Sequence, residues 1–306
     1  MDLVVVGSVG LDDVETPFGK RERALGGSAN FFSLAASFFT RVGFVGVIGT
    51  DYPAEGVELL KSRNVDVRGL EQVEGPTFRW AGKYGYDLNQ RETLLTELGV
   101  FGDFSPTLPE DYATAKYLFL GNIHPALQLD VLDQAKGAEF IAMDTMNFWI
   151  EGTPDALKQV LGRVHALLIN DSEARELTGE SNIVKAALAI EQMGPHLIVI
   201  KRGEYGALIY QKGQFFFAPA FPLEDVVDPT GAGDCFAGGF MGYIARHDDT
   251  SWDALCQATI AGSTMASYSV EKFSVDRLVD LDPAAIAQRA ERFRQLTDFS
   301  PLRPLD

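Results

Sequence analysis

The sequence predicts an α/β protein in which helices cover both faces of a central, mainly parallel sheet. Short, continuous apolar runs, typical of strands buried on both faces, alternate along the chain with segments of helical character. Successive parallel strands need crossover connections, and the helices between them supply these connections. The strand-like runs lie at 3–6, 42–48, 117–120, 140–144, 166–170 and 197–200, and helices are expected at 29–39, 53–61, 155–163, 184–193 and 235–245, among others.

Small or polar residues follow several of these strands. Gly7, Gly121, Asp144 and Asn170 each stand at the end of an apolar run. In open parallel sheets, ligands bind outside the carboxyl ends of the strands. The sequence therefore places a ligand site at this edge of the sheet.

The stretch from 65 to 104 has a different pattern. It is rich in alternating or β-forming residues, and Gly75-Pro76, Gly82 and Gly85 supply turns, whereas helical segments are missing. We expect a small, exposed β-sheet formed by about 12–20 and 65–104. This sheet is inserted in a single domain that spans 1–306.

Composition narrows the classes of partner. The 306 residues are 46% hydrophobic and 23% charged, which is ordinary globular usage. The formal net charge of −17 disfavours nucleic acid and anionic membrane as partners. The two cysteines form no CxxC motif, Met1-Asp2 carries no basic signal region, and no apolar run reaches the ~18 residues of a membrane helix. We expect a soluble, cytoplasmic protein.

The strongest chemical motif is the run Asp-Pro-Thr-Gly-Ala-Gly-Asp at 228–234, which leads directly into a helix. Gly231 and Gly233 let a ligand approach the backbone, and the first turn of the helix offers unpaired N–H groups and a positive dipole end. This arrangement favours phosphate binding. Asp234 beside such a cradle suits a base that takes a proton from a hydroxyl aimed at the phosphate. From spacing alone, an ordinary Asp cap after a glycine turn remains equally open.

This motif, with Phe236 after it, closely resembles the C-terminal signature of PfkB carbohydrate kinases. Gly-Gly-Ser-Ala-Asn at 26–30 resembles their N-terminal signature, and 45–51 and 170–179 also look like the family. The four matches occur in family order and cover most of the chain. The resemblance implies a ribokinase-like fold with a β lid, and ATP-dependent phosphorylation of a hydroxymethyl group of a sugar or sugar-like molecule.

The resemblance also implies roles on the nucleotide side. Asp234 matches the catalytic base, and Asn170 and Glu173 match a motif associated with phosphate and Mg²⁺, with Glu173 acting through ordered water. Asn170 and Glu173 also fit a helix start, and both interpretations can hold at once. The other residues are the anion hole of Gly231, Ala232 and Gly233, the neighbouring Thr230, Lys201 and Gly203 after a strand, Ala258 and Gly262 on a small-residue helix facing adenine, and Asp228 in a loop that resembles a monovalent-cation (K⁺) loop.

The substrate side is implied in the same way. Asp12 matches an Asp that holds sugar hydroxyls, although a solvated loop acid is the alternative and Asp13 is its neighbour. A carboxylate suits adjacent hydroxyls because it only accepts hydrogen bonds. The other candidates are Gly26, Gly27, Asn30 and, at a strand end, Asn122. The aromatic residues of the expected small sheet would hold it together, cover the ligand, or form a homodimer through the lid of a second subunit.

Other functions stay open. Phe31 and Phe32 replace the longer polar run of many relatives, so a nucleoside (adenosine-like) kinase or a polyol kinase is the alternative within the class. A nucleotide or metabolite sensor without catalysis is the alternative of another class, but Asp234 would serve no purpose in it. A Rossmann dehydrogenase is disfavoured, because the run from Gly7 to Gly10 lacks the full G-x-G-x-x-G pattern.

Overall fold

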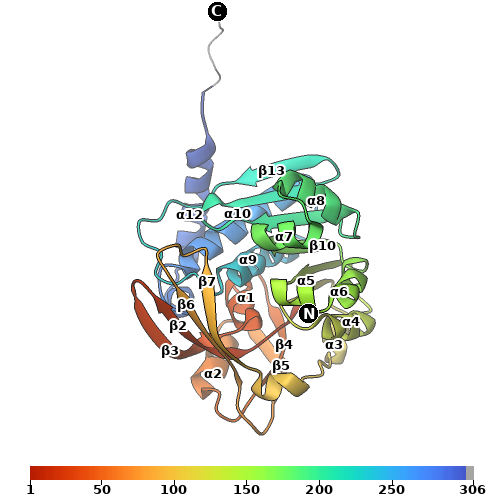
Figure 1. Cartoon of the computed structure of the whole chain (residues 1–306), viewed down its shortest axis with the longest axis vertical. Coiled ribbons are helices and arrows are strands. Elements are labelled where there is room, and N and C mark those ends of the chain that lie inside the picture. Colours follow the sequence, from red (N-terminus) through yellow and green to blue (C-terminus); the bar gives the residue numbers. More distant parts are fainter. Residues whose placement is uncertain (301–306) are drawn as a thin grey trace, which may run out of the picture.

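A nine-stranded sheet forms the centre of the molecule in the computed structural model, which describes residues 1–300 (Figure 1). Seven of its strands are parallel, and two antiparallel strands extend one edge. The α/β fold class is therefore confirmed. In spatial order the strands are β13 (Gln214–Ala218), β12 (Ala207–Gln211), β11 (Leu197–Lys201), β10 (Ala166–Asn170), β9 (Phe140–Asp144), β8 (Tyr117–Leu120), β1 (Leu3–Val6), β4 (Val42–Ile48) and β5 (Val65–Gln72).

Helices cover both faces of this sheet, because alternate residues of each strand point to opposite sides and both sides are apolar. In β1, Leu3 and Val5 join one hydrophobic cluster, whereas Val4 and Val6 join the other. The first cluster includes α1 (Ser28–Ala36), α2 (Ala54–Ser62), α9 (Ala232–His247), α10 (Trp252–Ser269), α11 (Asp276–Val279) and α12 (Pro283–Thr297). The second includes α3 (Glu110–Ala113), α4 (Pro125–Gln134), α5 (Asn147–Gly152), α6 (Pro154–Leu161), α7 (Asp171–Thr178) and α8 (Ile183–Glu191).

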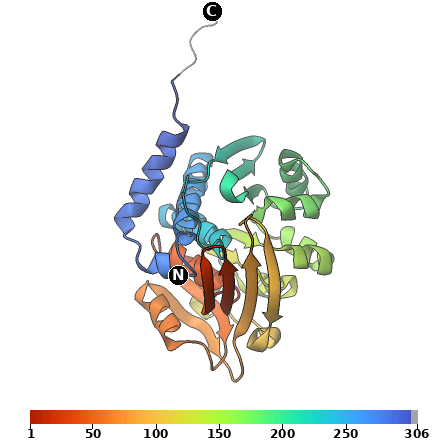
Figure 2. The ribbon, with the colours of Figure 1, turned by 60° about the vertical axis from the view of Figure 1, so that its left-hand side comes forward.

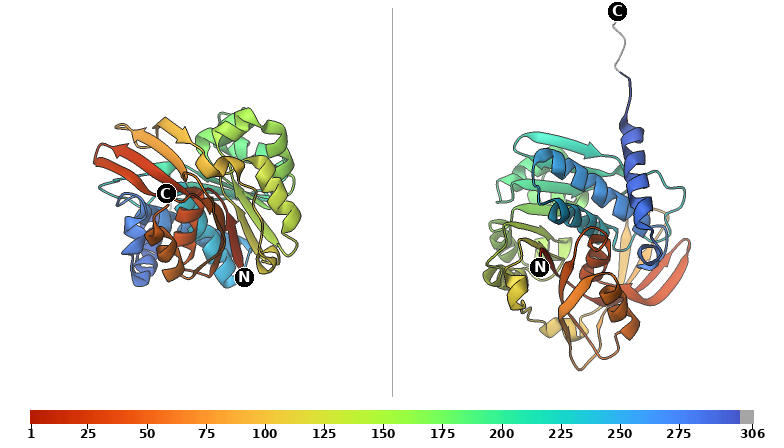
Figure 3. Two further views of the ribbon diagram at one scale, coloured as in Figure 1. Left: turned by 90° about the horizontal axis from the view of Figure 1, so that it is seen from below. Right: turned by 180° about the vertical axis from the view of Figure 1, so that it is seen from behind.

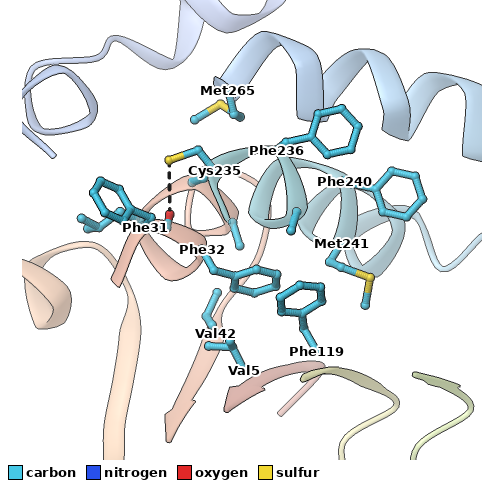
Figure 4. Close-up of a cluster of buried hydrophobic side chains, with 14 of the residues drawn as sticks. Val5, Phe31, Phe32, Val42, Phe119, Cys235, Phe236, Phe240, Met241 and Met265 are labelled. Carbon is cyan, nitrogen blue, oxygen red and sulfur yellow. Dashed lines mark hydrogen bonds between the residues drawn. The ribbon is translucent and has the colours of Figure 1, made fainter. Parts of the chain in front are cut away.

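Close packing of α1 and α9 against the sheet fixes the position of the phosphate-binding motif. The Phe32 ring of α1 stacks on the Phe119 ring of β8 with centroids 4.5 Å apart. Figure 4 shows this pair beside Val5 and Met241, with the thiol of Cys235 hydrogen-bonded to the carbonyl oxygen of Phe31 (Sγ–O 3.7 Å). The start of α9 is thus anchored to α1, which is itself buried along its whole length.

A second, four-stranded sheet stands apart from the first, in the order β3 (Gly19–Gly26), β2 (Gly10–Thr16), β6 (Phe78–Tyr84), β7 (Arg91–Glu97). We call it the small sheet. In Figure 2 its strands cross in front of the large sheet, and the left view of Figure 3 shows them extending to one side. Short 3-10 helices, η1 (Gly99–Asp103) and η2 (Gly203–Tyr205), lie in the connections after β7 and β11.

The boundaries of the small sheet differ from the expectation of about 12–20 and 65–104. Residues 65–72 form β5, which pairs in parallel with β4 at the edge of the large sheet. Only Val65 and Gly69 of this edge strand are buried, so its sequence mixes polar and apolar residues like that of an exposed strand. The first part of the small sheet also extends further than expected, to Gly26. Within residues 1–300, no helix combines the length and apolarity that crossing a membrane requires.

Candidate active site

The glycine loop before α9 is held in one conformation by its own side chains. Asp228 accepts hydrogen bonds from the backbone N–H groups of Thr230 and Ser274, both at 2.9 Å. Gly231 has φ +75°, a left-handed conformation that favours glycine, and a Cβ here would collide with the ring of Phe31. Helix α9 starts immediately after it. The Ala232 N–H donates to the Pro229 carbonyl oxygen at 3.2 Å, whereas within residues 1–300 the N–H groups of Gly233 and Asp234 make no backbone hydrogen bond, so these two groups form a preorganised anion cradle.

Asp234 lies in the first turn of α9, at this cradle. Its pKa is raised from 3.8 to about 7, first by burial and then by the nearby charge of Asp144, although Lys201 and Arg91 oppose the rise. A carboxylate with a pKa near neutrality suits a general base, because it is available and still basic enough to accept a proton. The geometry therefore brings the predicted base to the predicted cradle.

Three neighbouring strands end beside this cradle. In the large sheet β9, β10 and β11 are adjacent, and they end at Asp144, Asn170 and Lys201. Lys201 donates to Asp144 with Nζ–Oδ2 at 2.9 Å, in a pair that is mostly buried. The same Nζ would lie only 3.0 Å from a Cβ placed at Gly233. Lys201 therefore puts a positive charge directly against the glycine turn, as expected of a phosphate-binding residue.

Asn170 and Glu173 form a capping box at the start of α7. The Asn170 side chain accepts from the Glu173 N–H at 2.8 Å, and the Glu173 carboxylate accepts from the Asn170 N–H at 3.1 Å. The helix-start interpretation is therefore confirmed. The pKa of Glu173 is raised to about 7, first by burial and then by the charge of Asp144. Its role towards Mg²⁺ stays a prediction, and residues 1–300 contain no group of three or more Asp, Glu, His or Cys side chains arranged to hold a metal.

Asp12 lies on β2 of the small sheet and is only 5% exposed. Its pKa is raised to about 8, first by burial and then by the charges of Asp228 and Asp234, so these acids lie within electrostatic reach of one another. A Cβ at Gly26 would collide with the Asp12 carboxylate. Gly26 is therefore needed for the approach of β3 to Asp12.

Asn30 is buried in the first turn of α1, where its amide donates to the Gly26 carbonyl at 2.6 Å and to the Tyr52 hydroxyl at 3.0 Å. Gly27, with φ +91°, makes the turn into this helix against the carbonyl of Ser8. These contacts orient Asn30 beside the strand that carries Asp12. Contact of either residue with a substrate stays a prediction.

Asn122 follows β8 and sits in a separate group of contacts. Its side-chain oxygen accepts from the Trp149 indole N–H at 2.8 Å, and its nitrogen donates to the Met146 sulfur at 3.0 Å. The amide is thus already engaged by the segment after β9. A role for Asn122 in substrate binding stays a prediction.

The small sheet contacts the glycine loop and also the turn after β11. The Thr230 hydroxyl donates to the Tyr84 hydroxyl of β6 at 3.2 Å. A Cβ at Gly203, which has φ +53°, would collide with the side chain of Asn89 in the turn between β6 and β7. The small sheet therefore lies closed against the loop before α9 and against the turn after β11.

The prediction that adenine lies against Ala258 and Gly262 is not supported by the structure. Ala258 is 0% exposed, and a Cβ at Gly262 would lie 2.7 Å from the carbonyl oxygen of Phe236 in α9. These small residues allow α9 and α10 to pack closely, so helix packing alone accounts for their size, and contact of either residue with adenine stays a prediction.

The sequence analysis missed two charged residues of the site. Asp144 was recognised only as a strand end, because its partner Lys201 comes from a strand far along the chain. Arg91 begins β7 and lowers the pKa of Asp12, Glu173 and Asp234. No local motif marks Arg91, and only the folding of the small sheet over the cradle reveals it.

An anion cradle with a half-buried carboxylate, at the carboxyl ends of a parallel sheet, defines the class of small-molecule kinases. The profile of the pfkB family carbohydrate kinases matches residues 3–280, and the chain belongs to this family. It is therefore a phosphotransferase that acts on an alcohol group.

Individual proteins that resemble this chain are also kinases. The chain is 35% identical over 253 residues to a cytidine kinase of Thermococcus kodakarensis, and this match covers 80% of this chain and 89% of the relative. Among solved structures, the adenosine kinase of Sinorhizobium meliloti superposes with a TM-score of 0.80 at 18% identity, covering 94% of this chain and 99% of the other. A ribokinase II of E. coli in complex with ATP and Mg²⁺ gives 0.76 at 18% identity, covering 95% and 99%. At this identity, the two structures show the fold alone.

Proposed function

We propose that this enzyme transfers the γ-phosphoryl group of ATP to the hydroxymethyl group of a nucleoside. Asp234 takes the hydroxyl proton as the acceptor oxygen attacks phosphorus, and the bond between the γ-phosphorus and the bridging oxygen of ADP breaks. The observation that carries this proposal is the position of Asp234, whose pKa is raised to about 7 in the first turn of α9 beside Lys201.

ATP and Mg²⁺ fit the residues present. The N–H groups at the start of α9 and the Nζ of Lys201 would hold the phosphates. Their local positive potential would overcome the repulsion between the phosphates and a protein whose net charge is −17. Glu173 would hold Mg²⁺ through water, since magnesium keeps several of its water ligands. The bound metal would neutralise charge on the phosphates during transfer. The E. coli relative with ATP and Mg²⁺ supports this pair of cofactors.

A monovalent cation is a further part of the proposal. Both oxygens of Asp228 accept backbone N–H groups, so main-chain carbonyls of the 228–230 loop would supply most ligands of K⁺. An ion there would stabilise the loop that forms the cradle. Comparing turnover in KCl with turnover in choline chloride at equal ionic strength tests this part, and equal rates would contradict it.

The acceptor would be held by Asp12 and Asn30, with the small sheet as a lid. Asp12 would accept hydrogen bonds from adjacent sugar hydroxyls, and in doing so it would recover part of the hydration that burial removes. The contacts of Tyr84 with Thr230 and of Asn89 with Gly203 would keep water from the cradle. Excluding water prevents hydrolysis of ATP in place of transfer.

A nucleoside is favoured over a free sugar because the cytidine kinase relative matches over 89% of its own length. The test is a panel of cytidine, adenosine, ribose and fructose with ATP and Mg²⁺, followed by ADP release. We expect the highest kcat/KM for a nucleoside. Turnover of sugars alone would make the enzyme a sugar kinase, and binding of ATP without turnover of any acceptor would favour a sensor.

A homodimer through the small sheet also stays a proposal. The edge strand β7 exposes Leu94, and Leu98 follows it; these two residues are 55% and 52% exposed. Exposed apolar residues beside an unpaired edge strand favour association with a second copy. Light scattering of wild type and of Leu94→Asp tests this, with a dimer expected only for wild type. A monomeric wild type would contradict it.

A further inference from the structure

The pairing of strands in the small sheet decides which side chains face the site. Asp12 of β2 pairs with Trp80 of β6, and Tyr84 of β6 pairs with Arg91 of β7. Paired residues project to the same face of a sheet, and residues two apart in a strand share that face. Because Tyr84 meets Thr230 of the glycine loop, this face is the one turned towards the cradle. Arg91 therefore shares the inner face with Asp12.

The guanidinium of Arg91 is held over an aromatic ring and has no carboxylate partner among residues 1–300. Its central carbon lies 5.7 Å from the centroid of the Trp80 ring, and that ring lies across Gly82. Within the described part of the chain, Arg91 of β7 makes no ion pair, whereas the two cations of the neighbouring strand β6 do. These are Arg79, paired with Asp13, and Lys83, paired with Glu15, and both stand on the outer face.

The charge of Arg91 reaches acids on three separate elements. It lowers the pKa of Asp12 on β2, of Glu173 on α7 and of Asp234 on α9, although burial raises all three. These acids surround the space between the acceptor side and the nucleotide side. Lys201 supplies positive charge to this space from the large sheet, and Arg91 supplies it from the opposite, small-sheet side.

We propose that Arg91 is a further catalytic residue, whose guanidinium contacts the phosphoryl group while it passes from the nucleotide to the acceptor hydroxyl. This inference rests on the proposed function. A planar guanidinium with several N–H donors matches phosphate oxygens in a bidentate way, and a donor aimed at charge that develops in the transition state accelerates the chemical step. Because Arg91 belongs to the small sheet, closure of that sheet would add its positive charge to that of Lys201 around the negatively charged phosphoryl group.

The test compares Arg91→Ala and Arg91→Lys with Lys83→Ala, a matched control that removes a cation from the outer face of the same sheet. The acceptor is the compound that wild type phosphorylates best. We expect Arg91→Ala to lower kcat by about 10²-fold, the typical loss for one transition-state donor, while KM for the acceptor changes little. Arg91→Lys keeps the charge without the fork and is expected to lie between, and Lys83→Ala is expected to match wild type.

A pH profile separates catalysis from a structural role. Asp234 is faced by Asp144 on β9, Lys201 on β11 and Arg91 on β7. Removing the Arg91 charge disfavours the carboxylate of Asp234, so the acid limb of kcat/KM is expected to move to higher pH in Arg91→Ala. A variant that merely loosens the small sheet would keep the limb in place.

Three kinetic outcomes would contradict the proposed role of Arg91 or the proposed function. Unchanged kcat in Arg91→Ala would overturn the inference, and so would a loss confined to KM for the acceptor, which would make Arg91 a binding residue only. Wild-type turnover with an unaffected Arg91→Ala enzyme leaves the proposed function intact while the inference fails. Absence of turnover by wild type with every acceptor would overturn both.

Discussion

Replacing Asp234 by Asn is expected to stabilise the folded protein while it abolishes catalysis. The pKa of Asp234 rises from 3.8 to about 7 on folding, mainly because burial removes water from the carboxylate. Between these two values the folded state keeps a proton that the unfolded state has lost. The contribution of Asp234 to the free energy of unfolding therefore falls as the pH rises from about 4 to about 7.

The shift sets the size of the effect. A rise of about 3 pH units corresponds to at most ~4 kcal/mol at pH 8. Asp234 keeps some solvent contact, and the shift is shared with Asp144 and Lys201, so we expect ~2 kcal/mol, or about 4 °C in Tm for a chain of this size. Active sites commonly sacrifice stability in this way.

Urea unfolding of wild type and Asp234→Asn at pH 4.5, 6 and 8 measures this difference. It should be close to zero at the lowest pH and largest at pH 8. Asp253→Asn is the matched control, because Asp253 occupies the first turn of α10 but is exposed, and its difference should stay within ~0.5 kcal/mol at every pH. An Asp234→Asn protein that is equally or less stable than wild type at pH 8 would refute the reasoning.

Three further predictions concern activity. The acid limb of kcat/KM should have its midpoint near pH 7, because Asp234 must be deprotonated and its pKa in the free enzyme is about 7; a profile flat from pH 5 to 8 would contradict this. Gly231→Ala should lower kcat/KM by at least about tenfold, since Ala at φ +75° strains the loop and collides with Phe31, and this is checked by steady-state kinetics. Glu173→Gln should keep Tm within about 2 °C, because Gln can still accept from the Asn170 N–H, while the Mg²⁺ concentration for half-maximal rate rises about tenfold; an unchanged Mg²⁺ requirement would remove Glu173 from the metal site.

The sequence was sufficient to predict the large sheet, because strands buried on both faces carry a continuous apolar pattern. It failed at β5 (Val65–Gln72), where an edge strand that is only partly buried resembles the strands of the small sheet. The distinction depends on pairing with β4, which is a tertiary contact. The residues of β5 alone do not indicate that it pairs with β4.

The cradle and its base were predictable because 228–234 is contiguous and each residue type has a chemical reason. Asp144 and Arg91 were not, because each acts through partners on other elements, such as Lys201 for Asp144. Ala258 is ambiguous for a related reason, and its predicted contact with adenine stays a prediction. A small residue on a helix suits close packing of another helix as well as it suits a ligand, and only the contact between α9 and α10 distinguishes them.

The most direct test of the account is a pair of measurements on Asp234→Asn with ATP, Mg²⁺ and the preferred acceptor. Calorimetric titration measures acceptor binding, and rapid-quench kinetics measures a single turnover. The account predicts binding within about threefold of wild type and a phosphoryl-transfer rate lower by about 10³-fold or more, because only the proton acceptor has been removed. A variant that binds the acceptor normally and transfers the phosphoryl group at the wild-type rate would contradict it.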